Sequence, residues 1–375
     1  MPDSRSQIAH ASMPTVDLPR LGRSVSRFGL GGFHQLEITT DIVAEVVDAY
    51  LACGGTYVET ARGYGQGASE EKIGRALEGR RDRVVLVSKS GAATADDIRR
   101  DLELSLKALR TDRLDIYFFH GATSDKLDRL TAPGGAVEGL TRAIDEGILG
   151  GMGLSSHVPA TYGPAMERID LAVILIWCNY LDNLNFPAIP ERIIPDARRR
   201  GVVVTGMKPL ADGLLWRSAE PAARYCLAAG ADVVVCGTNS PPQVRQIAAA
   251  VAAGPLDEAG REELLRTAPE LGRYVCRRCG RCPAEVMDTF RLEGELDRQM
   301  VDYLPHDPAD YALRQRLSGW FARADAARAD FAASGRTADA LRAAAEGVAC
   351  PYGIDIPRKL RLATAKLTGG EPQRV

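Results

Sequence analysis

Short apolar runs rich in β-branched residues alternate with longer segments of helical periodicity from Arg27 to about Ala253. Eight such runs occur, at residues 28–31, 56–59, 84–88, 114–120, 148–154, 171–177, 202–207 and 233–237. Between them lie segments with apolar residues at helical spacing, including 39–52, 95–109, 136–146 and 187–200. This alternation predicts parallel strands joined by helices, because a parallel neighbour needs a long crossover connection.

Eight strand–helix units match a (β/α)8 TIM barrel, which usually occupies roughly 250 residues. An open doubly wound sheet fits less well, because no G-x-G-x-x-G turn follows any predicted strand. Residues 18–26 contain a Leu-Gly-Arg turn and predict a small hairpin that closes the bottom of the barrel. We therefore predict the α/β class, with a barrel over residues 1–255.

The alternation stops after Gly254-Pro255, and a helical pattern without strand signals continues to the end of the chain. We predict a second, helical domain over residues 256–375. Its segments 288–303, 308–326 and 337–347 are amphipathic or Ala-rich and are expected to be packing helices. One apolar face is formed by Leu313, Leu317, Trp320 and Phe321. Residues 369–375 are expected to form a frayed tail.

Composition excludes several classes of protein. Apolar residues make up 45% and charged residues 26%, with 47 basic and 49 acidic side chains and a pI of about 6.3. This balance gives no bulk reason to expect a nucleic-acid or membrane partner. Runs such as 171–177 are far shorter than the roughly 20 residues that span a bilayer, and residues 1–24 lack a secretory apolar core. We expect a cytoplasmic protein whose eight cysteines are mostly thiols or metal ligands.

Four polar residues follow predicted strand ends, where a barrel places its reacting groups. Glu59 and Tyr64 follow the second strand, Lys89 closes the third and His120 closes the fourth. A tyrosine with its ordinary pKa of about 10 becomes a useful acid near neutrality when a cation such as Lys89 stabilises its phenolate. Glu59 can pair with Lys89, and His120 can orient a substrate carbonyl. Each residue alone could be an ordinary strand-end group, but four in this order favour a catalytic site.

At these positions the sequence resembles the aldo-keto reductase superfamily, which carries Asp, Tyr, Lys and His on a (β/α)8 barrel. The resemblance covers roughly Leu18 to Ala253 and includes GGTYVETARGYG, SEEKIGRAL, LSLKALRTDRLDIYFFH, MGLSSH and GMKPLADG. The family's aspartate is Glu59 here, a longer side chain that can still pair with Lys89 but could shift Tyr64. The resemblance implies hydride transfer between a nicotinamide cofactor and a carbonyl or alcohol substrate, with Tyr64 as general acid/base.

The resemblance also implies a nicotinamide cofactor extended across the barrel mouth. It assigns Ser155, Ser156 and Asn179 to the nicotinamide, Met207, Lys208 and Leu210 to the pyrophosphate, and Gly237, Thr238, Ser240 and Gln243 to the adenosine phosphate. Any one of these could instead be an ordinary residue of a loop that opens a helix. Gln243 stands where many relatives carry a basic residue for the 2′-phosphate, and Ile247 replaces a family Asn. The cofactor is therefore expected to be NADP or NAD.

A second chemical signal lies outside the barrel, in Cys276-Arg-Arg-Cys279-Gly-Arg-Cys282-Pro283 and the later Cys350-Pro351. Three cysteines at i, i+3 and i+6, with a Cys-Pro from elsewhere, match the bacterial ferredoxin pattern. The other positions that a second cluster would need carry no cysteine. We therefore predict a ferredoxin-like domain that holds one [4Fe–4S] cluster through these four cysteines.

Zinc is the main alternative at these cysteines, although structural zinc more often uses two separated ligand pairs. Metal-free thiols so close together would invite oxidation, and Gly280 suggests a backbone that approaches a cluster sulfur. Arg277, Arg278 and Arg281 either face solvent or offset the negative charge of a cluster. The remaining cysteines, expected in the core, are Cys53, Cys178, Cys226 and Cys236.

A barrel with such an extension resembles the iron–sulfur branch of the aldo-keto reductases, with MKPLADG and CPYGIDIPRKL as the most typical pieces. The resemblance implies an oxidoreductase in which the cluster is structural, relays electrons to a partner, or reacts itself. A different hypothesis is a cluster-dependent lyase, dehydratase or electron-transfer enzyme whose barrel binds substrate without nicotinamide, with Cys350 as the cysteine that leaves one iron open. A third is a barrel retained as a binding or regulatory subunit.

Overall fold

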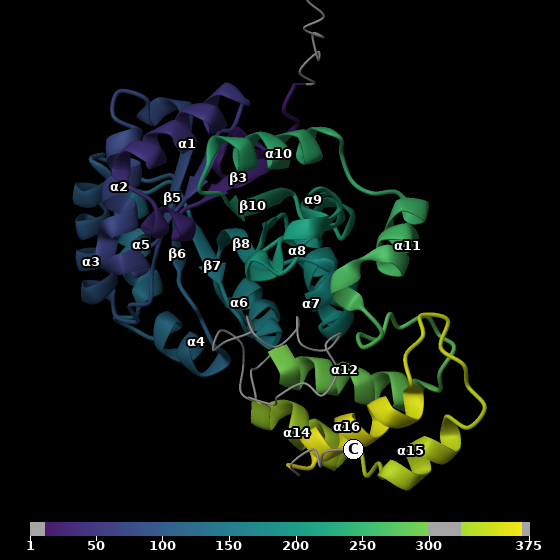
Figure 1. Cartoon of the computed structure of the whole chain (residues 1–375). Helices are drawn as coiled ribbons and strands as arrows, with labels where there is room; N and C mark the ends of the chain where they lie inside the picture. Colours follow the sequence, from purple (N-terminus) through teal and green to yellow (C-terminus); the bar gives the residue numbers. More distant parts are fainter. Residues whose placement is uncertain (1–11, 299–323, 370–375) are drawn as a thin grey trace, which may run out of the picture.

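The computed structural model describes residues 12–298 and 324–369, and its centre is a closed barrel of parallel strands (Figure 1). The strands follow the order β10-β3-β4-β5-β6-β7-β8-β9 around the barrel. They are β3 (Phe28–Gly31), β4 (Tyr57–Glu59), β5 (Val85–Ser90), β6 (Ile116–Phe119), β7 (Met152–Ser155), β8 (Leu171–Trp177), β9 (Val203–Met207) and β10 (Val233–Gly237). Each predicted run contains or overlaps one of these strands, so the predicted (β/α)8 barrel is confirmed.

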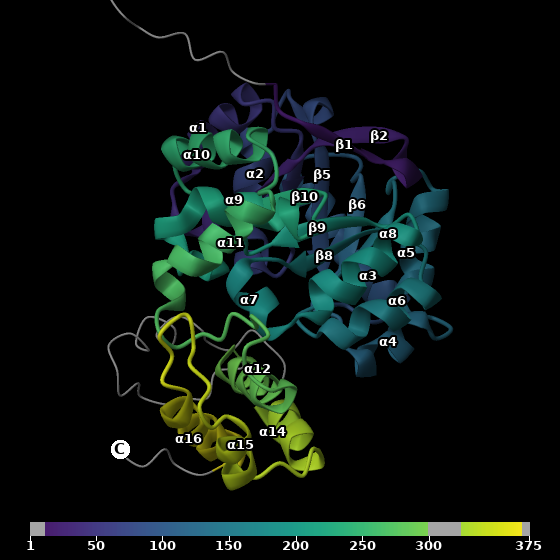
Figure 2. The same ribbon diagram turned by 90° about the vertical axis from the view of Figure 1, so that its right-hand side faces the viewer.

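Helices surround the strands (Figures 1 and 2). They are α1 (Thr40–Ala52), α2 (Ala68–Ala76), α3 (Ala95–Leu109), α4 (Ser124–Thr131), α5 (Ala136–Asp145), α6 (Tyr162–Arg168), α7 (Tyr180–Asn185), α8 (Ile194–Arg199), α9 (Ala219–Ala228) and α10 (Pro241–Ala252). The predicted helix 187–200 was wrong in detail. It divides into a π-helical turn (Ile189–Ile193) and α8, because Pro190 and Pro195 cannot donate the backbone bonds of a continuous α-helix.

An antiparallel hairpin of β1 (Thr15–Leu18) and β2 (Arg23–Ser26) covers the amino end of the barrel (Figure 2). Gly22 turns the chain with φ of 60°, a conformation that glycine adopts without steric cost. Leu18 and Val25 are buried among the apolar side chains that fill the barrel interior. The predicted hairpin is confirmed, and it begins three residues earlier than expected, at Thr15.

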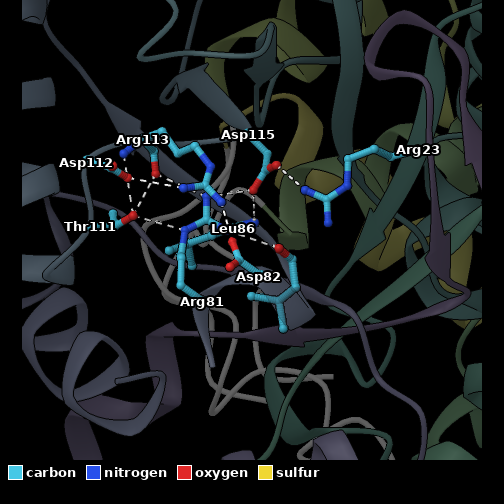
Figure 3. A network of polar contacts seen from close by, with 9 residues as sticks. Arg23, Arg81, Asp82, Leu86, Thr111, Asp112, Arg113 and Asp115 are labelled. Carbon is cyan, nitrogen blue, oxygen red and sulfur yellow. Dashed lines mark hydrogen bonds and ion pairs between the residues drawn. The ribbon is translucent and has the colours of Figure 1, made fainter. Parts of the chain in front are cut away.

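Asp115 fixes this hairpin to the barrel (Figure 3). Its carboxylate, at the amino end of β6, accepts hydrogen bonds from the Arg23 guanidinium of the hairpin and from the backbone N–H of Leu86, the latter at 2.8 Å. Arg81 adds an ion pair of 2.8 Å from Nη2 to Oδ2. Since these groups come from β2, from β5 and from the turn before β5, one carboxylate joins three parts of the closed end.

The described residues beyond Gly254 are helical. Their helices are α11 (Glu258–Thr267), α12 (Ala284–Arg298), α14 (Ala324–Ala333), α15 (Ala338–Ala344) and α16 (Ile356–Leu367). A separate apolar core joins α12, α14, α15 and α16 through side chains that include Phe290, Phe331 and Leu360. The predicted apolar face of Leu313, Leu317, Trp320 and Phe321 lies outside the described residues, as does the tail from residue 370.

The helical unit rests against the loops at the carboxyl ends of β8 and β9, with α12 beside α7 in both views (Figures 1 and 2). Leu181 and Leu215 pack against Leu271 in a shared apolar cluster. Glu270 adds polar contacts, because its Oε2 accepts hydrogen bonds from Tyr180 Oη and Ser218 Oγ at 3.1 Å each. The helical unit is therefore seated on the face of the barrel that carries the βα loops.

Buried charges join α12 to α16. Glu293 and Lys366 are fully buried, and Lys359 is nearly so. Glu293 Oε1 lies 2.7 Å from Lys366 Nζ, and its Oε2 lies 2.5 Å from Lys359 Nζ. Burial alone would raise the pKa of Glu293, but the two lysines outweigh burial and lower the pKa to about 2. Lys366 also pairs with Asp297 at 3.1 Å, so two cations face two anions.

We predict that Glu293→Gln lowers the free energy of unfolding by about 3–5 kcal/mol, because it leaves two buried ammonium groups with too little negative charge. Urea denaturation followed by far-ultraviolet circular dichroism measures the change. The matched control is Glu138→Gln, which breaks the exposed pair with Arg142 and should leave the free energy of unfolding nearly unchanged. Equal losses in the two variants would contradict this account.

Candidate active site

A cavity of about 720 Å³ opens at the carboxyl ends of the barrel strands. Its walls come from seven strands, β3, β4 and β6 to β10, or from the loops that follow them, and they include Glu59, Tyr64 and His120. A closed parallel barrel gathers its strand ends on one face, so residues far apart in sequence converge there.

Lys89 and Glu59 form a buried ion pair beneath the cavity. Lys89 on β5 is fully buried, and its Nζ donates hydrogen bonds of 2.9 Å to Glu59 Oε1 and to the backbone oxygen of Thr60. Burial alone would lower the pKa of Lys89, but Glu59 and Tyr64 outweigh burial and raise it. The longer acidic side chain thus reaches Lys89 and keeps it charged.

Tyr64 stands in a tight turn above this pair. The chain takes positive φ at Gly65, Gln66 and Gly67, and a Cβ at Gly67 would overlap the Arg62 guanidinium. The Tyr64 ring centre lies 5.1 Å from Lys89 Nζ. Burial raises the pKa of Tyr64, and Lys89 offsets only part of this rise. Tyr64 is therefore a protonated phenol at neutral pH, with the Lys89 ammonium beside its ring.

His120, at the end of β6, packs edge-to-face on Tyr64 with ring centres 5.6 Å apart. Burial, together with smaller effects of the nearby Lys89, His157 and Lys126, lowers the pKa of His120 to about 3. The imidazole is therefore neutral at physiological pH and can donate a hydrogen bond without carrying charge. The structure brings all four predicted catalytic residues together, with Lys89 behind the wall that the other three line. Their roles in catalysis remain predictions.

Seven of the ten predicted cofactor contacts line the same cavity. They are Ser155, Met207, Lys208, Leu210, Gly237, Thr238 and Gln243. A Cβ at Gly237 would lie 2.1 Å from His34 Cδ2, so a larger residue there would displace the His34 ring. Lys208 also pairs with Asp212 at 2.5 Å, which partly neutralises the cation nearest the proposed pyrophosphate position.

Three predicted cofactor contacts, Ser156, Asn179 and Ser240, lie outside the cavity lining. The side chains of the first two instead make hydrogen bonds with nearby backbone groups. Ser156 Oγ donates to the backbone oxygen of Ala122 at 2.6 Å. Asn179 caps α7, with its Oδ1 accepting from Asp182 N at 2.8 Å and its Nδ2 donating to the backbone oxygen of Lys208 at 2.9 Å. Ser240 is the residue that precedes α10.

The sequence did not reveal several residues of the cavity wall. Trp216, with 63% of its surface exposed, is part of the cavity wall. His34 and Glu37 also line the wall, with His34 Nδ1 lying 3.2 Å from Glu37 Oε1. His157, which stacks on Trp177 with ring centres 5.9 Å apart, also lines the wall. Sequence offered one usable signal, the position of His157 directly after the MGLSS strand end. Exposure of a loop tryptophan cannot be inferred from its neighbours in sequence.

A small second cavity lies in the helical unit, and all four predicted ligand cysteines line it: Cys276, Cys279, Cys282 and Cys350. Apolar side chains, including Phe290 and Ile354, complete its wall. The backbone N–H of Arg278 donates to Cys276 Sγ at 3.4 Å. Burial, together with smaller effects of the neighbouring cysteines, raises the pKa of the Cys282 thiol to about 11. The fold thus brings Cys350 to the triple run from a distant part of the chain.

These cysteines do not converge on a point. Within residues 12–298 and 324–369, no three His, Cys, Asp or Glu side chains are spaced to hold a single metal ion. A preformed zinc site needs its ligands around one ion, whereas a cubane is wider and spreads its four cysteines over separate irons. The predicted core positions of Cys178, Cys226 and Cys236 are confirmed, and Cys53 packs at the edge of the same core.

Residues 27–224, more than half of the chain, match the model of the aldo/keto reductase family. The chain belongs to this family. Its match to the uncharacterized oxidoreductase YqkF of Bacillus subtilis is 26% identical and covers 52% of this chain but only 65% of that relative. The chain thus spans slightly less than two thirds of that relative's length. The family model does not reach the helical unit.

Solved structures agree with the barrel. The holo form of aldo-keto reductase AKR11C1 from Bacillus halodurans is 27% identical, with a TM-score of 0.60 over 68% of this chain and 96% of that one. An aldo-keto reductase from Klebsiella pneumoniae in complex with NADPH is 26% identical, with a TM-score of 0.56 over 66% of this chain and 93% of that one. Among the helices of the described residues, none has the length and apolar character needed to cross a membrane.

The neutral, buried His120 predicts acid sensitivity. Its folded pKa of about 3 lies below the unfolded value of about 6.5, so the unfolded state binds a proton first as the pH falls. Stability should therefore fall by about 2 kcal/mol from this group between roughly pH 6.5 and pH 4.5. Denaturation of wild type and His120→Asn at a series of pH values measures it. The acid-induced loss should be smaller in the variant, and equal losses would contradict the prediction.

Proposed function

We propose that this protein is an oxidoreductase of the aldo-keto reductase type that transfers a hydride between NADP(H) and the carbonyl or alcohol carbon of a small-molecule substrate. The observation that carries this proposal is the convergence of Glu59, Lys89, Tyr64 and His120 at one cavity of about 720 Å³. That volume lies within the range of small-molecule sites. Family membership and the NADPH complex of the Klebsiella relative support it.

The residues would divide the work of proton transfer. NADPH, when bound, supplies the hydride, which is two electrons and a proton. Tyr64 Oη gives its proton to the substrate oxygen, which becomes the hydroxyl of the alcohol, and Lys89 stabilises the phenolate that remains. Neutral His120 donates a hydrogen bond that orients the carbonyl, and Glu59 holds Lys89 in place. Alcohol oxidation uses the same steps in reverse.

NADP is the proposed cofactor, and NAD is the alternative because Gln243 is uncharged. Gln243 Oε1 accepts a hydrogen bond from the backbone N–H of Asn239 at 2.9 Å, so this side chain shapes the loop rather than presenting a cation. Lys208 and Leu210 would lie near the pyrophosphate. Asn179 would support that position from behind, through its contact with the backbone of Lys208.

We predict that Tyr64→Phe lowers kcat for carbonyl reduction by about 100-fold or more, because the proton donor is lost while the ring remains. Fluorescence titration should show unchanged NADPH binding in this variant. Tyr225→Phe, which changes a tyrosine outside the cavity lining, is the matched control and should keep full activity.

Retained reduction by Tyr64→Phe would contradict the assigned role. Lack of saturable binding of both NADPH and NADH to wild type would contradict the hydride proposal itself. It would favour the alternative of a lyase, dehydratase or electron-transfer enzyme whose barrel works without nicotinamide.

The proposal includes one [4Fe–4S] cluster held by Cys276, Cys279, Cys282 and Cys350. The residues fit the group, because four thiols face one apolar cavity and a backbone N–H points at a cysteine sulfur. A bound cluster exchanges single electrons, whereas hydride transfer moves two. It would therefore fasten residue 350 to the triple run and supply a one-electron site for an electron-transfer partner.

We predict that anaerobically purified protein contains about four iron and four sulfide per chain, without stoichiometric zinc. Chemical analysis and visible absorption measure this content. Cys279→Ser should lose most of the iron, whereas Cys53→Ser, a cysteine packed against the barrel core, should retain it. Stoichiometric zinc without sulfide would contradict the cluster and favour the zinc alternative.

A further inference from the structure

Arg277 stands between the first two cysteines of the triple run, and only 7% of it is exposed. Arg277 lines the cysteine cavity, and its guanidinium carbon lies 5.0 Å from the centre of the Tyr352 ring. Its hydrogen bonds go to four backbone oxygens, those of Leu265 (3.2 Å), Leu271 (3.2 Å), Gly272 (2.7 Å) and Val275 (2.6 Å). Across the described residues, no carboxylate lies within ion-pair distance of this cation.

Two other cations near the cysteines, Lys359 and Arg278, each have a carboxylate partner. Lys359 is buried but pairs with Glu293 at 2.5 Å. Arg278 is one residue away in the same motif, yet its side chain is 34% exposed and pairs with Glu191 at 3.3 Å. Within the described residues, Arg277 is thus a buried cation whose partners are backbone carbonyls and an aromatic ring, with no carboxylate.

Such a cation needs negative charge nearby, because an isolated buried ion costs several kcal/mol. Four carbonyl dipoles supply part of the compensation. Arg277 lines the same cavity as all four cysteines. Since no carboxylate of the described residues pairs with Arg277, thiolates at this cavity are the negative charge that can face it.

We propose that Arg277 is the counter-ion of the cysteine-bound cluster and raises its reduction potential. This inference rests on the proposed [4Fe–4S] site. Reduction adds one electron, and hence one negative charge, to a site that already carries the charge of four thiolates. A fixed cation in a poorly screened cavity stabilises the reduced form more than the oxidised form. Removal of that charge shifts the potential to more negative values.

Arg277 also braces the backbone of residues 265–275, so its charge must be separated from its hydrogen bonds. Arg277→Gln removes the charge and most of the donors. Arg277→Lys keeps the charge but cannot span four carbonyls, because an ammonium is a compact donor. Arg278→Gln is the matched control, since it removes an exposed, paired arginine and leaves the backbone N–H to Cys276 in place.

The test is a dithionite titration through soluble mediators, followed by visible absorption and electron paramagnetic resonance. We expect the midpoint potential of Arg277→Gln to be more negative than that of wild type. Arg277→Lys should stay close to wild type, and Arg278→Gln should be unchanged. Loss of the cluster from Arg277→Gln with retention at wild-type potential in Arg277→Lys would also support a role for the charge.

Three results would overturn the inference. An unshifted potential in Arg277→Gln would show that the charge has no effect on the cluster. An equal shift of the potential in both Arg277 variants, or loss of the cluster from both, would show that Arg277 acts through its hydrogen bonds to the backbone of residues 265–275 and not through its charge. A wild-type protein without iron and sulfide would refute the cluster itself, and this inference with it. That last failure appears in the analysis of wild type, before any variant is compared.

Discussion

The buried ion pair of Lys89 and Glu59 is the interaction on which the rest of the active site depends. An ammonium at the base of a barrel cavity would lose its proton to burial if no anion faced it. Glu59 lies 2.9 Å away and preserves the charge. Because Lys89 stays charged, the Tyr64 phenolate that would form on proton transfer has a cation beside it. The same cation helps to keep His120 neutral.

Glu59 also shows how the barrel accommodates a glutamate where the resemblance to the aldo-keto reductases implies an aspartate. The pair is built across adjacent strands, β4 and β5, so the distance between the two Cα atoms is fixed by the sheet. An extra methylene must then be absorbed by side-chain rotation. The contact at 2.9 Å and the position of Tyr64 above Lys89 indicate that the rotation leaves the arrangement intact.

The barrel cavity and the helical unit are linked through the loop that follows β9. Lys208, Ala211 and Asp212 in this loop have positive φ, a conformation that costs about 1–3 kcal/mol per non-glycine residue. Such strain persists where surrounding contacts over-determine the backbone. Here those contacts come partly from the helical unit, through the apolar cluster around Leu215 and through the Ser218–Glu270 hydrogen bond. The helical unit thus stabilises a wall of the proposed cofactor site.

Sequence periodicity was sufficient for the barrel, because each strand must present a compact apolar run to two covered faces. It was also sufficient to select the four residues at the strand ends, since parallel topology brings those ends together. It could not predict that Asn179 caps α7, because a capping role depends on where a helix begins in space. It could not predict the raised pKa of Tyr64 either, since that depends on burial by neighbours such as Phe33, whose ring centre lies 5.2 Å away.

Arg277 and Arg278, which are neighbours in sequence, show the same limit of prediction from sequence. Their sequence context is nearly identical, and both were expected either to face solvent or to offset cluster charge. In the fold, the Arg277 guanidinium points inward to four backbone carbonyls, and the Arg278 guanidinium reaches Glu191 at the surface.

Buried cations elsewhere in the helical unit have anionic partners, since Lys359 and Lys366 both pair with Glu293. A buried cation without an anion is therefore not a common feature of this core. Among the described residues, such a cation occurs at the cysteine cavity, where burial raises the pKa values of the Cys276 and Cys282 thiols. Thiols that bind a metal centre become anionic. In the proposed cluster site, folding of residues 276–282 around the cluster and burial of Arg277 would then be two parts of one electrostatic balance.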